Sequence, residues 1–184
     1  MDMAEKKLSS QLIYDGRILR LHVDTVELPN GKRAIREVAD HPGGVAIVAI
    51  DNDGSVLTVK QYRYVFPRVV EEIPAGKLEP GEDPYEAALR ELKEETGATP
   101  ERFTELGPLV VSPGAYGEVL RLYLAEGLDI GAQSPDEDEF LDVARTPFDE
   151  MVRRVTDGEL TDAKTVAGVL KVYALRQPAQ ERRP

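Results

Sequence analysis

The chain has 184 residues, with 34 acidic against 23 basic side chains, and its formal net charge is −11. This length predicts one domain, or one domain with a small appendage. The negative charge argues against a general binder of nucleic acid or of anionic membranes, because phosphate groups would be repelled. The absence of cysteine excludes disulfides, thiolate nucleophiles and cysteine-bound zinc, and it fits a reducing, cytoplasmic location. Residues 1–11 are charged and polar, so we expect neither a signal peptide nor a membrane anchor.

The first part of the chain predicts β-structure. Residues 18–21 and 23–28 are rich in β-branched and other apolar side chains, and the turn signal Pro29-Asn30-Gly31 follows them. Residues 34–38 then predict another strand. We expect residues 1–42 to form an N-terminal β-hairpin region.

A second β-region follows the glycine pair Gly43-Gly44. Residues 45–50 form an apolar run that predicts a buried strand. Residues 51–54 are a turn sequence, and residues 56–62 predict the returning strand of a hairpin.

A helix with clear start and stop signals lies in the middle of the sequence. Residues 74–81 form a loop punctuated by glycine and proline, after which Asp83 is placed as the N-cap and Pro84 at the first helical position. Gly97 stands where a left-handed residue commonly ends a helix. We therefore predict a helix between Asp83 and Gly97. The face expected to pack on a sheet carries Tyr85, Ala88 and Leu92.

More strands are predicted after this helix. Residues 109–111 and 119–125 are expected to be strands joined by the loop 112–117. A polar loop over 131–139 precedes a short strand over 140–143.

Two amphipathic helices follow in the last part of the chain. In each, apolar residues recur at i, i+3, i+4 and i+7, and we expect both stripes to lie in the core. The order of elements predicts an α+β domain over residues 43–176, with a frayed tail over 177–184. The stripes are Phe148, Met151, Val152 and Val155 in the first helix and Val166, Val169, Leu170 and Tyr173 in the second.

Three glutamates on the central helix form a candidate metal site. Glu91, Glu94 and Glu95 stand at i, i+3 and i+4 and therefore share one face. Their mutual repulsion costs about 0.2–0.5 kcal/mol for each close pair, and bound hard cations would remove that cost. Oxygen ligands without sulfur or histidine indicate Mg²⁺, with Mn²⁺ as a substitute, in preference to zinc. The alternative is a solvated helix face on which Arg90 pairs with Glu86 and Glu94.

The residues around this helix follow a longer pattern. Five residues separate Gly76 from Glu82, and seven more separate Glu82 from the pair Arg90-Glu91. Leu92, Lys93, Glu94-Glu95, Thr96, Gly97 and Ala98 complete the pattern. It resembles the Nudix box at every defined position. The resemblance implies a Nudix-type α/β/α sandwich with a mixed sheet, preceded by an N-terminal antiparallel β-subdomain. It also implies Mg²⁺-dependent hydrolysis of a nucleoside diphosphate linked to another group.

Three further runs narrow the resemblance. Gln61-Tyr62-Arg63 precedes the box, Glu72-Ile73-Pro74-Ala75-Gly76 leads into it, and Pro113 lies sixteen residues after Gly97. These runs resemble the ADP-ribose pyrophosphatases, which implies hydrolysis of ADP-ribose to AMP and ribose 5-phosphate by a homodimer that exchanges N-terminal strands. The run Ala115-Tyr116-Gly117-Glu118 departs from the subfamily, which usually has an aromatic residue followed by an Asp-Glu pair. Specificity toward the terminal ribose is therefore open.

The resemblance also implies roles for individual residues. Glu91 and Glu95 would be the principal metal ligands, with Glu94 bound directly or through water and the carbonyl of Ala75 completing one shell. Glu139 resembles a metal-binding glutamate of the acidic loop 136–139. Catalysis would involve Glu137 as general base, together with Glu94 and Arg90. The two loop glutamates are interchangeable in this assignment, and the alternative for the loop is a flexible acidic turn.

Substrate contacts are implied at a second group of residues. Arg63 would hold a phosphate, although a peripheral ion pair is the alternative. Arg36 and Glu37 would reach the adenosine end of the substrate from the partner subunit. The two histidines, His22 and His41, are expected to be structural. The full set of implied substrate contacts is Arg63, Arg36, Glu37, Gly76, Pro113 and Glu118.

Two other functions stay open at this point. One is a Nudix enzyme for a different substrate, such as a sugar nucleotide, a diadenosine polyphosphate or an oxidised nucleoside triphosphate. The other is an ADP-ribose sensor that does not cleave its ligand. Retention of Glu91, Glu94 and Glu95 argues against the sensor.

Overall fold

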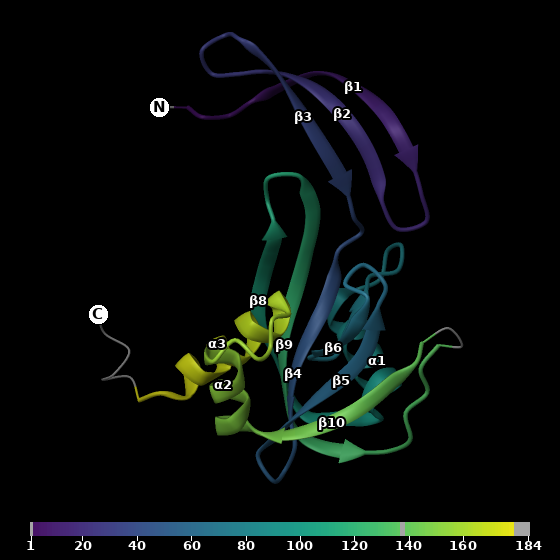
Figure 1. Ribbon diagram of the computed structural model, residues 1–184, viewed down its shortest axis with the longest axis vertical. Coiled ribbons are helices and arrows are strands. Elements are labelled where there is room, and N and C mark those ends of the chain that lie inside the picture. Colours follow the sequence, from purple (N-terminus) through teal and green to yellow (C-terminus); the bar gives the residue numbers. More distant parts are fainter. Residues whose placement is uncertain (1, 137–138, 179–184) are drawn as a thin grey trace. The chain divides into compact units, whose positions relative to one another are not determined.

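The computed structural model describes residues 2–136 and 139–178, and the chain divides into two compact units (Figure 1). The hairpin formed by β8 and β9 contributes its tip to the first unit and its stem to the second. The first unit consists of Met1–Gly43 and Val110–Val119, and the second of Gly44–Leu109 and Leu120–Pro184.

The first unit is built on an antiparallel meander of β1 (Lys6–Asp15), β2 (Arg20–Glu27) and β3 (Arg33–Asp40). Gly31, with φ 78°, makes the predicted turn between β2 and β3, and both of these strands were expected. Strand β1 was not. Its ten residues are all exposed, so it shows no alternation of apolar and polar side chains by which the sequence would reveal it.

The second unit contains a mixed sheet. Strand β4 (Gly44–Ile50) runs parallel to β9 (Tyr116–Ile130) and antiparallel to β5 (Ser55–Arg63). Strand β10 (Leu141–Pro147) pairs with the other edge of β5. The predicted strands at 45–50, 56–62, 119–125 and 140–143 are all confirmed, with β9 and β10 extending further than expected.

Three strands correct the sequence prediction in this unit. Strand β6 (Arg68–Glu72) pairs with β5, and strand β7 (Ala75–Lys77) pairs with β4 inside the segment that was predicted to be a loop. Strand β8 (Ala98–Ser112) is far longer than the predicted segment 109–111. A three-residue strand containing Gly76 has no periodicity to detect, and only its pairing with β4 defines it.

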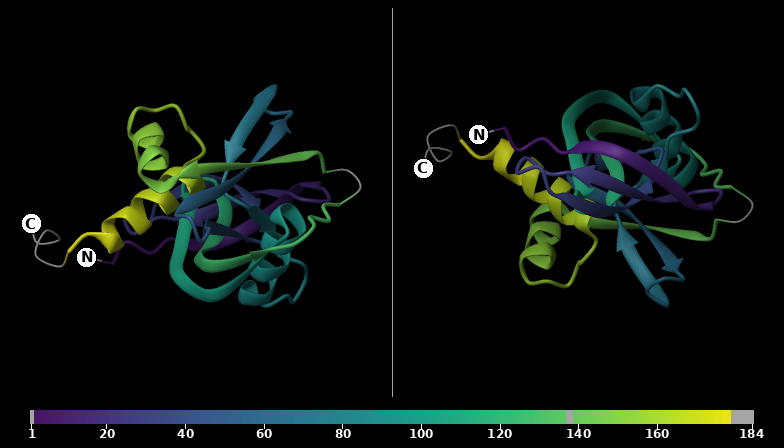
Figure 2. Two further views of the ribbon diagram at one scale, coloured as in Figure 1. Left: turned by 90° about the horizontal axis from the view of Figure 1, so that it is seen from below. Right: turned by 90° about the horizontal axis from the view of Figure 1, so that it is seen from above.

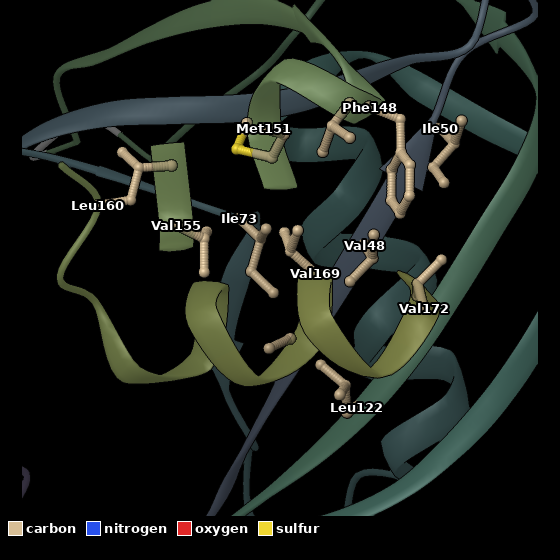
Figure 3. Close-up of a cluster of buried hydrophobic side chains, with 12 residues drawn as sticks. Val48, Ile50, Ile73, Leu122, Phe148, Met151, Val155, Leu160, Val169 and Val172 are labelled. Atoms are coloured by element: carbon tan, nitrogen blue, oxygen red, sulfur yellow. The ribbon is translucent and has the colours of Figure 1, made fainter. Parts of the chain in front are cut away.

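Helices cover both faces of this sheet (Figures 1 and 2). Strand β4 is buried on both sides, because its side chains alternate between two cores. Val45, Ile47 and Ala49 pack with α1 (Pro84–Thr96). Ala46, Val48 and Ile50 pack with α2 (Phe148–Thr156) and α3 (Ala163–Arg176), as Figure 3 shows for Val48 and Ile50. This arrangement is the predicted α/β/α sandwich.

The buried face of α3 differs slightly from the predicted stripe. Gly168 and Val172 are buried, whereas Tyr173 is 41% exposed. A Cβ at Gly168 would lie 2.8 Å from the Val48 side chain, so the helix approaches β4 closely at this glycine. The sequence stripe missed Gly168 because a glycine carries no apolar side chain. Across the described residues, no helix is long and apolar enough to cross a bilayer.

A buried carboxylate links β1 and β2 in the first unit. Asp24 is 6% exposed, and its Oδ1 lies 2.9 Å from Nδ1 of His22. The Nζ atom of Lys7 lies 3.2 Å from Asp24 Oδ2, and Nε2 of His22 lies 3.2 Å from Asp40 Oδ2. Hydrogen bonding by Ser10, then by His22 and Lys7, holds the pKa of Asp24 at about 2 despite partial desolvation. The hydrogen bond to Asp24 raises the pKa of His22 above its ordinary value of 6.5.

These pKa shifts predict that the contribution of His22 to the stability of the fold depends on pH. A raised folded-state pKa adds stability that is complete below the unfolded pKa and is lost as the pH rises through the folded value. Asp24 acts in the opposite sense, and its contribution is lost only as the pH falls toward about 2. We expect the difference in unfolding free energy between the unsubstituted protein and His22→Gln to be larger at about pH 5 than at about pH 9. Urea denaturation followed by circular dichroism measures it, and equal differences at both pH values would contradict the assignment.

Candidate active site

Helix α1 holds the three predicted glutamates on a rigid support. Its N-cap is Asp83, whose Oδ1 accepts hydrogen bonds from the N–H groups of Tyr85 at 2.9 Å and Glu86 at 3.3 Å. Its C-cap is Gly97, with φ 74° and an N–H that donates to the Lys93 carbonyl. Both predicted caps are therefore confirmed. Ala88 and Leu92 are fully buried on the sheet side as expected, whereas Tyr85 is 42% exposed and contacts Phe103 edge-on.

Two of the three glutamates are buried. Glu91 is 8% exposed and Glu95 is 3% exposed, so they do not lie on the solvated helix face considered as the alternative. The side chain of Glu94 is 34% exposed. Burial raises the pKa of Glu95 to about 8 and also raises the pKa of Glu91, and each of these two carboxylates also feels the negative charge of Glu139. A pair of buried, mutually repelling carboxylates is an arrangement that a bound cation stabilises.

The backbone of β7 lies against the carboxylates of Glu91 and Glu95. The N–H of Ala75 donates to Glu95 Oε2 at 3.0 Å. At the next residue, a Cβ on Gly76 would overlap the carboxylate of Glu91, so any larger residue there would displace this carboxylate. Pairing of Gly76 with Val45 of β4 holds this backbone in place.

Arg90 forms ion pairs with glutamates on helix α1 and just before it. Its Nη1 lies 2.9 Å from Glu91 Oε1 and 2.8 Å from Glu94 Oε2. Its Nε and Nη2 donate to the two carboxylate oxygens of Glu82 at 2.9 and 3.2 Å. The expected pairing with Glu94 is confirmed, but Glu82 replaces Glu86 as the second partner. The loop before α1 folds back toward the helix, a contact that helical spacing alone does not show.

The loop after β9 is attached to the end of α1. The N–H of Gly131 donates to the Gly97 carbonyl at 2.9 Å, and the N–H of Ser134 donates to the Glu94 carbonyl at 2.9 Å. Glu139 is partly buried, and its charge acts on Glu91 and Glu95. The predicted general base, Glu137, lies outside the described residues.

Arg63 makes an ion pair, which was the alternative considered for it, and its partner Glu72 is a residue that the sequence did not identify. Its Nε and Nη2 donate to Glu72 at 2.7 and 2.8 Å, and Lys164 bonds to the same carboxylate. Glu72 is 3% exposed, and these cations hold its pKa below the ordinary value against the effect of burial. The sequence placed Glu72 in a run that resembles the ADP-ribose pyrophosphatases but assigned no role to it or to Lys164. Their meeting depends on packing of α3 against the sheet.

The remaining predicted substrate residues belong to the first unit and are described within it. Arg36 pairs with Glu5, and Glu37 is exposed. Pro113 is exposed at the hairpin tip. Glu118 Oε1 lies 3.6 Å from Nδ1 of His41, whose side chain is 4% exposed and whose ring centroid lies 5.4 Å from that of Tyr116. His41 therefore has a structural contact in the loop that departs from the subfamily pattern.

The available donors around α1 suit a hard cation. They are the carboxylates of Glu91, Glu94, Glu95 and Glu139 and the carbonyl of Ala75, all of them oxygen. Among residues 2–136 and 139–178, no three acidic or histidine side chains are already arranged as a complete metal-ligand group. The guanidinium of Arg90 occupies part of the space between Glu91 and Glu94 instead.

Comparison with known proteins shows the family of the chain. Residues 40–168 match the NUDIX domain, and residues 5–39 match the nucleoside diphosphate sugar hydrolase N-terminal domain. A methanol dehydrogenase activator from Bacillus methanolicus is 44% identical over 167 residues, which cover 90% of each chain. An ADP-ribose pyrophosphatase from Bacillus subtilis is 41% identical over 169 residues, or 91% of each chain.

Further relatives are named for other substrates, and one of them has a solved structure with the same fold. A GDP-mannose pyrophosphatase from Yersinia enterocolitica is 31% identical over 166 residues, which cover 80% of this chain and 84% of that protein. The crystal structure of an ADP compounds hydrolase covers all of both chains with a TM-score of 0.84 at 25% identity. With its NUDIX domain, its full set of box glutamates and this fold, the chain belongs to the Nudix hydrolase family.

Proposed function

We propose that the protein hydrolyses the pyrophosphate bond of ADP-ribose, with water, to AMP and ribose 5-phosphate. The observation that carries the reaction class is the buried pair Glu91 and Glu95 facing the Ala75–Gly76 backbone. The substrate is supported by the similarity to an ADP-ribose pyrophosphatase and by the Gln61-Tyr62-Arg63 and Pro113 runs.

The proposed cofactor is Mg²⁺, with Mn²⁺ as a substitute. Glu91 and Glu95 would hold it with the Ala75 carbonyl, and Glu94 and Glu139 would complete the set. Bound magnesium supplies charge neutralisation at the pyrophosphate and a lowered pKa for the attacking water. The donor chemistry fits, because every candidate atom is oxygen and the buried Glu95 carboxylate has a neutral amide, not a cation, as its hydrogen-bond partner within the described part of the chain.

Proton transfer, orientation of the glutamates and binding of the phosphate would then be carried out by separate side chains. Glu137 or Glu139 of the acidic loop takes the proton from the attacking water. Arg90 keeps Glu91 and Glu94 oriented through its existing bonds. Arg63 uses Nε and Nη2 on Glu72, and its Nη1 is the atom proposed to contact a substrate phosphate. As in other phosphoryl transfers, positioning and charge stabilisation account for most of the effect.

The second candidate is hydrolysis of another nucleoside diphosphate derivative. The similarity to GDP-mannose pyrophosphatases favours it, and so does the changed run Ala115-Tyr116-Gly117-Glu118. A sensor without catalysis has less support, because the box glutamates are all present.

A substrate panel distinguishes these candidates. The purified protein is incubated with Mg²⁺ and ADP-ribose, GDP-mannose, a diadenosine polyphosphate or a nucleoside triphosphate, and products are separated by chromatography. We expect AMP and ribose 5-phosphate from ADP-ribose to form fastest. Faster cleavage of another compound would keep the reaction class and reject the substrate, whereas binding of ADP-ribose without cleavage would support the sensor.

Substitution of the box glutamates tests the proposed roles. We expect Glu95→Gln or Glu91→Gln to lower the rate at a fixed, subsaturating Mg²⁺ concentration by about 100-fold, because each removes a charged metal ligand. Glu86→Gln is the matched control, since Glu86 is exposed on the same helix. Unchanged rates for Glu91→Gln and Glu95→Gln would reject the proposed metal site.

We also propose that the protein is a homodimer formed through its first unit. This unit exposes apolar side chains along β1 and β3, with Leu12 49%, Ile13 52%, Tyr14 60% and Ile35 66% exposed. Several exposed apolar side chains on one small unit favour an interaction surface there.

Light scattering coupled to size-exclusion chromatography tests the homodimer. We expect twice the chain mass of 20.3 kDa. The paired substitution Ile13→Asp and Ile35→Asp should shift the protein toward the monomer, because a buried charge without a partner opposes association. A monomeric mass for the unsubstituted protein at micromolar concentration would reject the proposal.

A further inference from the structure

The segment from Glu72 to Gly76 is held in place at every residue. The N–H of Ile73 donates to the hydroxyl oxygen of Thr165 at 2.8 Å. The carbonyl of Pro74 accepts from the N–H of Ile47 at 2.9 Å. The N–H of Ala75 then donates to Glu95. Three successive backbone groups are thus fixed by three different parts of the fold. The partner of the third group, the Ala75 N–H, is a buried carboxylate of the proposed active site.

Thr165 is the contact that α3 makes to this segment. It is fully buried, and its hydroxyl donates to Asp162 Oδ2 at 2.6 Å while accepting from Ile73. The same Asp162 oxygen accepts the Thr165 N–H at 2.9 Å as the N-cap of α3. Because the single hydroxyl proton is directed at Asp162, the lone pairs of the oxygen are available to Ile73. Asp162 therefore orients the hydroxyl.

A parallel set of charges holds the same start of α3 to the same segment. Lys164 Nζ bonds to Asp162 Oδ1 at 2.9 Å and also to the Glu72 carboxylate. Arg63 holds Glu72 from its other side. The beginning of α3 thus fixes both the side chain of Glu72 and the backbone of Ile73.

Building on the proposed function, we propose that Thr165, oriented by Asp162, is a positioning residue for the metal-binding carboxylates. Its hydroxyl holds Ile73, and through Pro74 it sets the place of the Ala75 N–H and carbonyl relative to Glu95. Loss of the hydroxyl leaves the Ile73 N–H buried without its acceptor, and the segment shifts to satisfy it. Since Ala75 lies two residues further along the chain, this shift reaches Glu95 directly.

The test measures metal binding and not activity alone. Mn²⁺ binding to the full-length protein, without nucleotide, is followed by electron paramagnetic resonance for Thr165→Val, Thr165→Ser and the unsubstituted protein. We expect Thr165→Val to raise the Mn²⁺ dissociation constant about 10-fold, a typical effect for a residue that supports metal ligands. Thr165→Ser keeps the hydroxyl and should stay within about twofold of the unsubstituted protein.

Thr58→Val is the matched control for lost stability. Thr58 is also a fully buried threonine, and its hydroxyl donates to the Glu71 carboxylate at 3.0 Å, away from the box glutamates. We expect it to lower the melting temperature without changing Mn²⁺ binding. If Thr165→Val lowers the melting temperature in the same way and leaves the dissociation constant unchanged, Thr165 is only structural and the inference is wrong.

A further variant and two further outcomes complete the test. If Thr165→Val does not fold, Asp162→Asn replaces it, with a weakening of Mn²⁺ binding expected and unchanged binding counting against the inference. Because the assay contains no nucleotide, cleavage of a different substrate would reject the proposed function and leave the inference intact. Absence of Mn²⁺ binding by the unsubstituted protein would reject both.

Discussion

Burial of Glu91 and Glu95 is the constraint on which the rest of the active-site region depends. Moving a carboxylate out of water costs several kcal/mol unless other groups compensate for it. Here Glu95 accepts a hydrogen bond from the Ala75 N–H and Glu91 pairs with Arg90, and a side chain at position 76 would displace the Glu91 carboxylate. The strand that carries both residues is in turn held by β4. The residues of the Nudix box therefore contribute to packing, in addition to the metal-binding role proposed for its glutamates.

The cations near the carboxylates have a supporting role that follows from the same constraint. Arg90 binds Glu82, Glu91 and Glu94, while Arg63 and Lys164 bind Glu72. None of these contacts reaches Glu95, whose nearest hydrogen-bond donor is a neutral amide. A protein with a formal charge of −11 thus keeps one deeply buried carboxylate without a bonded cation. Under the proposed function, this imbalance would favour binding of a divalent ion and, with it, of a phosphorylated substrate.

Prediction from the sequence succeeded where the signal is local. Helix α1 was predicted with both caps because Asp83, Pro84 and Gly97 act within one turn of their positions. Strand β4 was predicted from its apolar run. Strands β1, β6 and β7 were missed: β1 is exposed throughout, β6 has only five residues without an alternating burial pattern, and β7 has three residues, so each is defined by its neighbour and not by its own pattern.

Local sequence was enough to identify the chemistry of the candidate site: three glutamates on one helix face, the glycines around them and a set of oxygen donors without sulfur or histidine near them. The folded arrangement was needed to show which of these glutamates are buried, and that Arg90 pairs with Glu82 in place of Glu86. It also brought Thr165 to Ile73, which lie 92 residues apart in the chain. Helical spacing constrains residues within a few positions of each other. Contacts across the chain arise only when the sheet and its helices pack together.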